Sequence, residues 1–207
     1  MSKKWRIAIM GTLTHLMLGT VYAWSFFQTP IAESAGWSNT QAAWAFSLSI
    51  FMLGLTSAWA GGKMSVYGPR KMAITGGILY ALGYLISGYA LSHQLLFLLY
   101  LGFGIIGGIG LGLAYVTPVA TVSAWFKENQ GLATGMVVMG FCFGALVMPK
   151  FLAPLFLSAT ENNLSTTFYY IGAVMLLVIP LSAMSLKLPA SDKNIVADTS
   201  AKDSISF

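Results

Sequence analysis

The sequence has few charged residues. Of its 207 residues, eleven are Lys or Arg and six are Asp or Glu, so charged residues make up 8% of the chain. An ordinary soluble domain carries about a quarter. Because 57% of the residues are hydrophobic, too few polar side chains remain to cover a soluble core, and a soluble protein is excluded.

The scarcity of cysteine and histidine excludes metal and redox chemistry. The chain has one cysteine, Cys142, and two histidines, His15 and His93. An internal disulfide is therefore impossible, and no Cys/His cluster has the spacing of a metal site. No cofactor is predicted. The net charge of +5 does not indicate nucleic-acid binding, since the basic residues are scattered between apolar stretches rather than gathered on one soluble face.

The sequence contains six long apolar runs. Each is long enough to cross a bilayer as a helix of about 20 residues, and the alternating pattern of a barrel strand is absent. We predict an all-α membrane protein, with six transmembrane helices in residues 1–189 and a disordered tail at 190–207. The runs are 7–27, 41–60, 72–91, 95–120, 131–157 and 167–186. The first two breaks are predicted at 30–39 and 61–71.

The basic residues predict the orientation of the spans. Lys and Arg accumulate in cytoplasmic loops near span ends. If the N-terminus is cytoplasmic, ten of the eleven basic residues lie inside, and only Lys150 lies near the outer end of a span. Both termini are then cytoplasmic, including the tail, and the chain is a multi-pass protein of the cell membrane.

Glycines recur in the fourth and fifth runs. Gly102, Gly104 and Gly107 match the dinucleotide-binding pattern G-x-G-x-x-G, but that motif needs a strand before it, and these glycines lie inside an apolar helix. Their spacing of four residues is more informative, because glycines one turn apart let two membrane helices approach closely. The residues predicted to pack helices in this way are Gly104, Gly108, Gly112, Gly131 and Gly135. A further pair at the same spacing is Gly140 and Gly144.

Two stretches carry a resemblance to a known family. The first is Gly61-Gly-Lys-Met-Ser-Val-Tyr-Gly-Pro-Arg-Lys71, which resembles the cytoplasmic loop signature of the major facilitator superfamily, with Ser65 at its acidic position. The second runs from Gly107-Gly-Ile-Gly-Leu-Gly-Leu-Ala-Tyr115 through Trp125-Phe126 to Gly135. It is similar to the oxalate/formate antiporter family within that superfamily, which also contains carriers of lactate and other monocarboxylates.

This resemblance implies a fold and a function. The chain resembles the N-terminal half of such a carrier, a six-helix bundle of two inverted three-helix repeats, with 190–207 as the start of the central loop. The implied activity is secondary transport of small organic anions, such as oxalate, formate or lactate, by alternating access. The signature residues Gly61, Gly68, Arg70 and Lys71 would act in the conformational change. The expected partners are a small carboxylate, the lipid bilayer and a second six-helix half.

Several alternatives remain open from the sequence. The chain is a fragment, one product of a split gene or a half-carrier, and an isolated half that does not transport is the main alternative function. An intramembrane serine protease would need a serine and a histidine on facing helices, but the fifth and sixth runs contain no histidine. We therefore do not predict an enzyme.

The candidate substrate residues are the polar groups inside the spans. No run contains a carboxylate, which favours an anionic or neutral substrate over a cation. His15 and Tyr22 lie on one stripe of the first run, and Gly112-x-x-Tyr115 in the fourth run repeats Gly19-x-x-Tyr22, as an inverted repeat would. We predict that His15, Tyr22 and Tyr115 bind substrate. The alternatives are a neutral histidine hydrogen-bonded to a neighbouring helix and tyrosines of an interfacial belt.

Overall fold

The computed structural model describes residues 2–189, and within that range every regular element is helical. Six helical segments are long and apolar enough to cross a membrane, which confirms the predicted number of spans. Several are built from consecutive elements without a loop between them. The elements are α1 (Lys3–Gly19), η1 (Thr20–Ala23) and α2 (Trp24–Ala35) in span one, α3 (Asn39–Tyr67) in span two and α4 (Pro69–Ser92) in span three. They continue with α5 (Leu96–Leu99), η2 (Tyr100–Gly107) and α6 (Gly108–Trp125) in span four, η3 (Lys127–Asn129), α7 (Gln130–Val147), η4 (Met148–Leu152) and α8 (Ala153–Ala159) in span five, and α9 (Leu164–Ala183) in span six. The predicted tail at 190–207 lies outside the described residues.

The predicted breaks at 30–39 and 61–71 both contain a turn of the chain, but each of them begins inside a helix. The first helix continues through Pro30 to Ala35, and α3 continues through Gly61 to Tyr67. The chain turns instead at Gly36 and Gly68, whose φ angles are 68° and 77°. Such angles are accessible to glycine at little cost. The backbone conformation of these two glycines therefore ends the helices, and neither Pro30 nor Gly61 does so.

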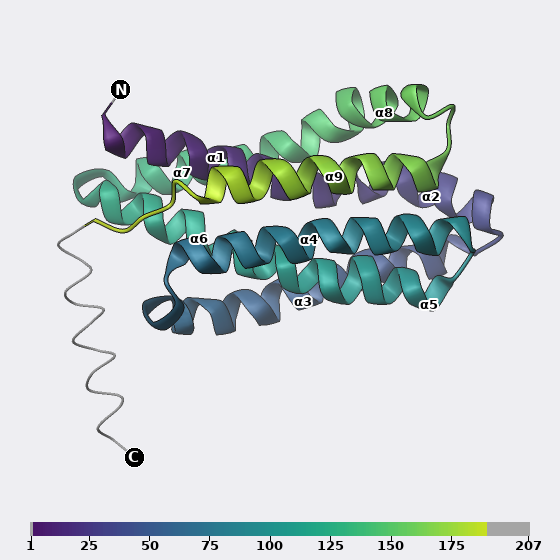
Figure 1. Cartoon of the computed structure of the whole chain (residues 1–207), viewed down its shortest axis with the longest axis horizontal. Coiled ribbons are helices and arrows are strands. Elements are labelled where there is room, and N and C mark those ends of the chain that lie inside the picture. The colour runs from purple at the N-terminus through teal and green to yellow at the C-terminus, as the bar shows by residue number, and fades with distance from the viewer. Residues whose placement is uncertain (1, 190–207) are drawn as a thin grey trace, which may run out of the picture.

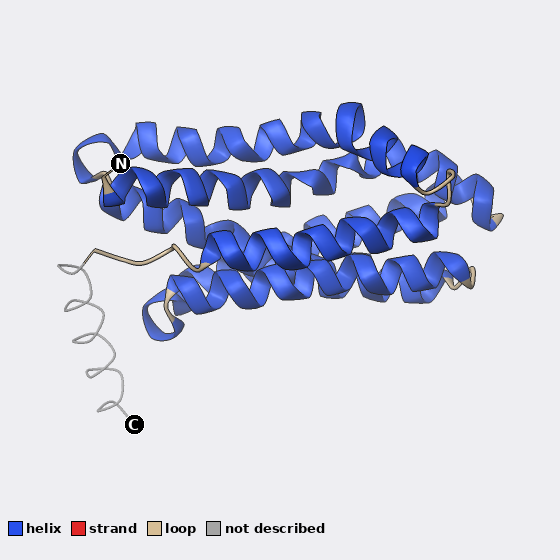
Figure 2. Ribbon diagram, turned by 45° about the horizontal axis from the view of Figure 1, so that its top comes forward, coloured by secondary structure: helices blue, strands red, loops and turns tan. Residues whose placement is uncertain are grey.

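The bundle has two layers, and its helices run along the long axis of the molecule (Figures 1 and 2). In the first layer α3 contacts α6, α6 contacts α1, and α1 contacts α7. In the second layer α4 and α9 lie side by side (Figure 1). The second layer covers the centre of the first, because α4 contacts α6 and α9 contacts α1. We call the row α3, α6, α1 and α7 the four-helix layer.

The contacts have the symmetry of an inverted repeat. Exchanging the first three spans with the last three converts the contact between spans one and five into that between spans four and two. Both contacts exist, and both are made through glycine. A methyl group added at Gly19 would collide with the carbonyl of Phe141 on α7. One added at the matching Gly112 would lie 2.8 Å from the carbonyl oxygen of Leu53 on α3.

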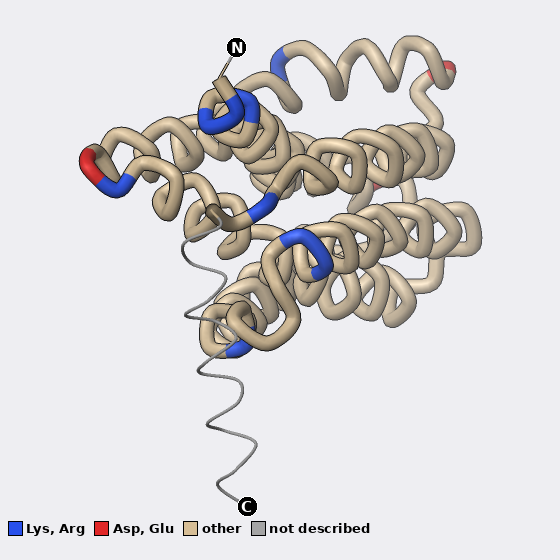
Figure 3. Tube along the Cα trace, turned by 60° about the vertical axis from the view of Figure 1, so that its left-hand side comes forward, with Lys and Arg blue, Asp and Glu red and all other residues tan. Residues whose placement is uncertain are grey.

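Charge is divided between the two ends of the bundle. Figure 3 shows most of the Lys and Arg residues gathered at the end that carries the N-terminus, which we call the basic end. Glu33 lies in the last turn of α2, at the opposite end of span one, and Glu161 follows the opposite end of span five. The basic residues of this end are Lys3, Lys4, Arg6, Lys63, Arg70, Lys71, Lys127 and Lys187.

Candidate functional site

The structure brings His15, Tyr22 and Tyr115 together around a fourth ring. The ring of Phe141, from α7, is 5.9 Å from His15 of α1, 5.5 Å from Tyr22 of η1 and 5.2 Å from Tyr115 of α6, measured between centroids. All three pairs meet edge to face, a favoured arrangement for aromatic pairs. We call these four residues the aromatic cluster, and it joins spans one, four and five.

Glycines in the two helices bring Phe141 into the cluster. Methyl groups added at Gly140 or Gly144 of α7 would collide with the backbone carbonyls of Thr12 and Leu16 on α1. Gly19 makes the reciprocal approach to Phe141. Because the two backbones touch, a large ring on this turn of α7 must lie against the side chains of α1 and α6.

His15 has no hydrogen-bond partner. Its side chain is fully buried, and neither ring nitrogen is bonded to another described residue. The ring of Tyr115 lies 5.0 Å away at a tilt of 40°. The alternative of a histidine hydrogen-bonded to a neighbouring helix is therefore not what this structure contains. An unpaired polar group in an apolar interior costs about 1–3 kcal/mol, so the cluster contains a buried polar ring whose hydrogen-bonding capacity is unsatisfied.

Tyr22 lies at the surface of the four-helix layer. It is 44% exposed, and its ring also meets Phe46 of α3 at 5.9 Å. Tyr115 is half-buried. Neither hydroxyl is hydrogen-bonded within residues 2–189. The cluster therefore combines two hydroxyls that have no hydrogen-bond partner among the described residues with one buried imidazole.

Span one changes helix type at Thr20, and Tyr22 lies within the changed turn. Span one tightens to a 3₁₀ turn over Thr20–Ala23, and hydrogen-bond geometry in such a turn is poorer than in an α-helix. The Thr20 hydroxyl donates to the Met17 carbonyl at 2.6 Å, and the Tyr80 hydroxyl donates to the Leu18 carbonyl at 3.4 Å. Tyr80 belongs to α4, so the second layer stabilises the turn that carries Tyr22.

The predicted packing glycines fall into two environments. Added methyl groups at Gly104, Gly108 and Gly112 would lie 2.7–2.9 Å from atoms of α3. Methyl groups at Gly131 and Gly135 would meet nothing within 4 Å. The structure therefore does not bring Gly131 and Gly135 against another described helix, and a packing role for them stays a prediction about a surface outside this bundle.

The signature residues are arranged around the turn between α3 and α4. Gly61 lies inside α3 with open space around it, so its predicted place in a loop was wrong. Gly68 makes the turn with its positive φ. Arg70 and Lys71 follow in the first turn of α4 and are exposed.

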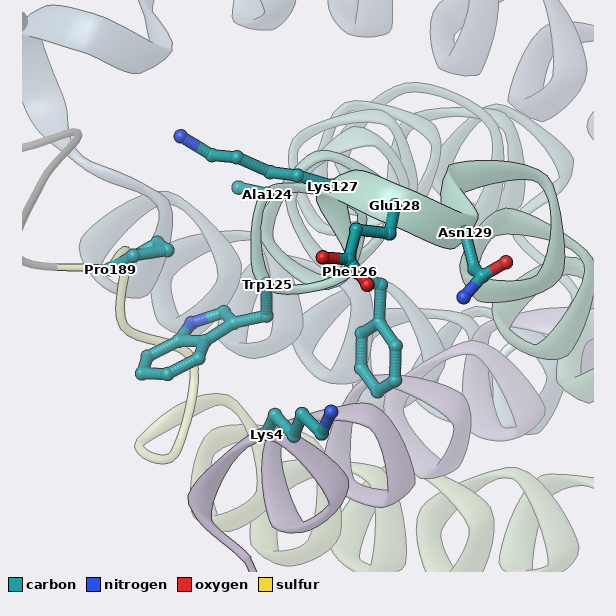
Figure 4. A pocket seen from close by; sticks show the side chains of 8 residues that line it. All are labelled: Lys4, Ala124, Trp125, Phe126, Lys127, Glu128, Asn129 and Pro189. Atoms are coloured by element: carbon teal, nitrogen blue, oxygen red, sulfur yellow. The ribbon is translucent and has the colours of Figure 1, made fainter.

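A separate cavity of about 360 Å³ opens at the basic end, between the start of α1 and the loop after α6. Figure 4 shows the side chains that line it, with the Lys4 amine beside the Phe126 ring, 5.5 Å from its centroid. Lys3 lies over Trp125 at 5.6 Å, and the Trp125 indole donates to the Lys187 carbonyl at 2.6 Å. These contacts connect spans one, four and six at the basic end of the bundle.

One protein family and several transport proteins are similar to this chain in sequence. A family model described as "Major Facilitator Superfamily" matches residues 8–204. The chain is 28% identical over 184 residues to the uncharacterized MFS-type transporter YhjX of Escherichia coli (strain K12), covering 89% of this chain and 44% of that protein. It is 27% identical over 191 residues to the oxalate:formate antiporter of Oxalobacter formigenes, covering 91% and 44%. It is 30% identical over 145 residues to monocarboxylate transporter 14 of Mus musculus, covering 70% and 28%. The chain thus spans less than half the length of these curated relatives.

Proposed function

The chain belongs to the Major Facilitator Superfamily, and we propose that it is one six-helix half of a secondary transporter that moves small carboxylates by alternating access. Oxalate, formate and lactate-like monocarboxylates are the proposed substrate class. The second half would come from the same or another polypeptide. Transport of this kind forms no covalent intermediate, so no enzymatic activity is proposed.

The aromatic cluster is the observation that carries this proposal. It lies on the four-helix layer, where Tyr22 and Tyr115 offer free hydroxyls and His15 offers an unpaired ring nitrogen. A carboxylate accepts hydrogen bonds from such donors, and bonds to a charged group are stronger than neutral ones. The acidic residues of the described part, Glu33, Glu128 and Glu161, are all exposed and lie at span ends or in loops. No negative charge near the cluster would repel an anion.

The relatives support the substrate class and the need for a second half. One is named an oxalate:formate antiporter, and others are named monocarboxylate transporters. In the superfamily's architecture a substrate site lies between two bundles near the membrane midplane. Because the chain spans about 44% of the first two relatives, the face that carries Tyr22 is the one we propose a second bundle covers.

We further propose that the basic end faces the cytoplasm of a cell-membrane protein. The six spans make it a multi-pass membrane protein, and the gathering of Lys and Arg at one end supports this orientation. Labelling of single cysteines at positions 33 and 161, in a Cys142→Ala background, should proceed in intact cells. Labelling only after permeabilisation would reverse the orientation.

Binding of carboxylates by hydroxyl-deleted variants tests the site. Tyr22→Phe and Tyr115→Phe keep the ring and remove one donor each. Losing a hydrogen bond to a charged ligand costs about 1.5–3 kcal/mol, or about 10- to 150-fold in affinity. Radiolabelled oxalate, formate and lactate would be measured on the full chain in lipid nanodiscs, alone and together with a second six-helix half. Tyr170→Phe makes the same change at an exposed tyrosine of α9 in the other layer and should bind as the parent does.

The outcomes separate the proposal from its main alternative. Weakened binding in both cluster variants, with Tyr170→Phe unchanged, supports the site. Unchanged affinity in both would make the tyrosines belt or packing residues and overturn it. If the folded chain binds carboxylate but neither it nor the pair takes substrate into proteoliposomes, the non-transporting membrane partner is the correct function.

A further inference from the structure

A second hollow at the basic end lies between the turn before α4 and the segment after α9. Its volume is about 310 Å³. Its walls come from two stretches of chain that are distant in sequence but adjacent in the fold, since α4 and α9 lie side by side. The lining residues are Tyr67, Gly68, Pro69, Arg70, Lys71, Leu186, Lys187 and Leu188.

Three cations line this hollow, which has no acidic residue of the described range in its walls. Arg70 and Lys71 come from the first turn of α4, and Lys187 comes from the segment after α9. None of the three forms an ion pair within residues 2–189, and no acidic residue of that range lines the hollow. A smaller cavity of about 150 Å³ adjoins it through Lys187 and adds Lys3 and Arg6 of α1. Mutual repulsion among these cations would be relieved by an anion.

The rest of the hollow is apolar. Leu186 is fully buried at its base, and Leu188, Pro69 and the ring of Tyr67 complete the wall. A small hydrophilic anion would leave these surfaces unused. A molecule with an anionic head and a hydrocarbon chain matches both parts.

The length of α4 indicates that the hollow is at the depth of the lipid headgroups. α4 has 24 residues, so its length is about 36 Å at ~1.5 Å per residue. The hydrocarbon core of a bilayer is about 30 Å thick. The first turn of α4 therefore emerges into the headgroup region, and α4 and α9 form the outer layer of the bundle, away from the face that carries Tyr22.

From this arrangement we propose that the hollow binds one anionic phospholipid, with its phosphate between Arg70, Lys71 and Lys187 and the start of an acyl chain against Leu188 and the ring of Tyr67. Basic pockets between transmembrane helices recognise anionic headgroups by this chemistry. The proposal concerns the second layer and does not depend on carboxylate transport.

Lipid retention by matched charge variants tests the proposal. The full chain would be purified with equal amounts of dioleoyl phosphatidylglycerol and dioleoyl phosphatidylcholine, and the bound lipid counted by native mass spectrometry. The parent should retain one phosphatidylglycerol. Each cation near the membrane surface contributes a factor of about five in affinity, so Lys71→Gln/Lys187→Gln should bind it about 30-fold more weakly. Lys63→Gln/Lys127→Gln removes the same charge outside the hollow and should retain the lipid.

Three results would overturn the proposal. One is equal loss of phosphatidylglycerol in the two double variants, which would make the attraction a property of the whole basic end. The second is equal retention of phosphatidylcholine by the parent. The third is displacement of the lipid by soluble glycerol phosphate at the same concentration, which would mean that the apolar wall contributes nothing. Thermal unfolding without added lipid checks that each variant is folded.

Discussion

The glycines of the fourth span and those at the start of the fifth have the same four-residue spacing but different surroundings. Gly108 lies against α3, where an added methyl group would be 2.8 Å from the Ser49 carbonyl oxygen and 2.7 Å from Cβ of Met52. Gly135 has no neighbour within 4 Å of the same position and is exposed. The spacing thus predicts a smooth helix face, while the partner on that face depends on the arrangement of the other spans.

The largest loss of stability is expected when a large side chain replaces a glycine of α6 that packs against α3. Gly108→Leu forces α6 away from the backbone of α3, because a carbonyl group cannot rotate aside as a side chain does. Overpacking of this kind costs about 3 kcal/mol at the upper end of its usual range. Thermal unfolding in detergent measures the loss. Gly135→Leu is the matched control, and equal destabilisation of the two variants would show that the surroundings of these glycines do not differ as described.

An intermediate loss of stability is expected for a large side chain at Gly102. From the sequence this glycine lies outside the stripe, yet an added methyl group would be 2.7 Å from the Cγ2 atom of Ile86 and 3.2 Å from the Gly83 carbonyl oxygen. The Ile86 side chain is able to shift, so Gly102→Leu should cost about 1–2 kcal/mol. The same unfolding assay should rank it between Gly108→Leu and Gly135→Leu. A loss as large as that of Gly108→Leu would contradict this ranking.

The fold was predictable because long hydrophobic runs indicate the number and order of the spans. Six runs became six helical spans, and the superfamily membership predicted from the motifs is confirmed. The first two runs were predicted to end too early, at residues 27 and 60, because the helices continue to Ala35 and Tyr67. A helix ends where a residue adopts a different backbone conformation, and only the structure distinguishes Gly68, with its φ of 77°, from Gly61.

The candidate site was predictable only in part. Its polar members stood out because a histidine and tyrosines are unusual inside an apolar span. Phe141 did not, since it is one of 13 phenylalanines and nothing in its local sequence marks it. Its place among His15, Tyr22 and Tyr115 follows from the close approach of α1 and α7. The glycine pair Gly140 and Gly144 was the available signal, but spacing alone does not name the helix that a stripe contacts.

A smaller difference in stability is expected between substitutions at Gly140 and Gly131 of the fifth span. A methyl group at Gly140 would lie 2.6 Å from the Thr12 carbonyl oxygen, so Gly140→Ala should cost about 1 kcal/mol. Because the same contact positions Phe141, carboxylate binding should weaken as well. Gly131→Ala, in open space nearer the start of the helix, should change neither property. A Gly140→Ala variant as stable as the parent would mean that α1 and α7 have room to separate freely.

The smallest effect on the chain itself is expected for Gly135→Leu. Substitutions at exposed positions away from special features usually change stability by about 0.5 kcal/mol or less, and replacing an exposed helical glycine removes a conformational cost rather than adding one. The chain alone should therefore unfold at nearly the parent temperature.

If a second six-helix half covers this face, however, the new side chain would occupy the space that the small residue leaves for a close approach between helices. Co-purification with a tagged second half should then fall, while Leu177→Ala, an exposed change on α9 in the other layer, should leave pairing intact. Undiminished pairing by Gly135→Leu would place the contact between the two halves elsewhere on the four-helix layer. It would also make the stripe at Gly131 and Gly135 a lipid-facing surface without a protein partner.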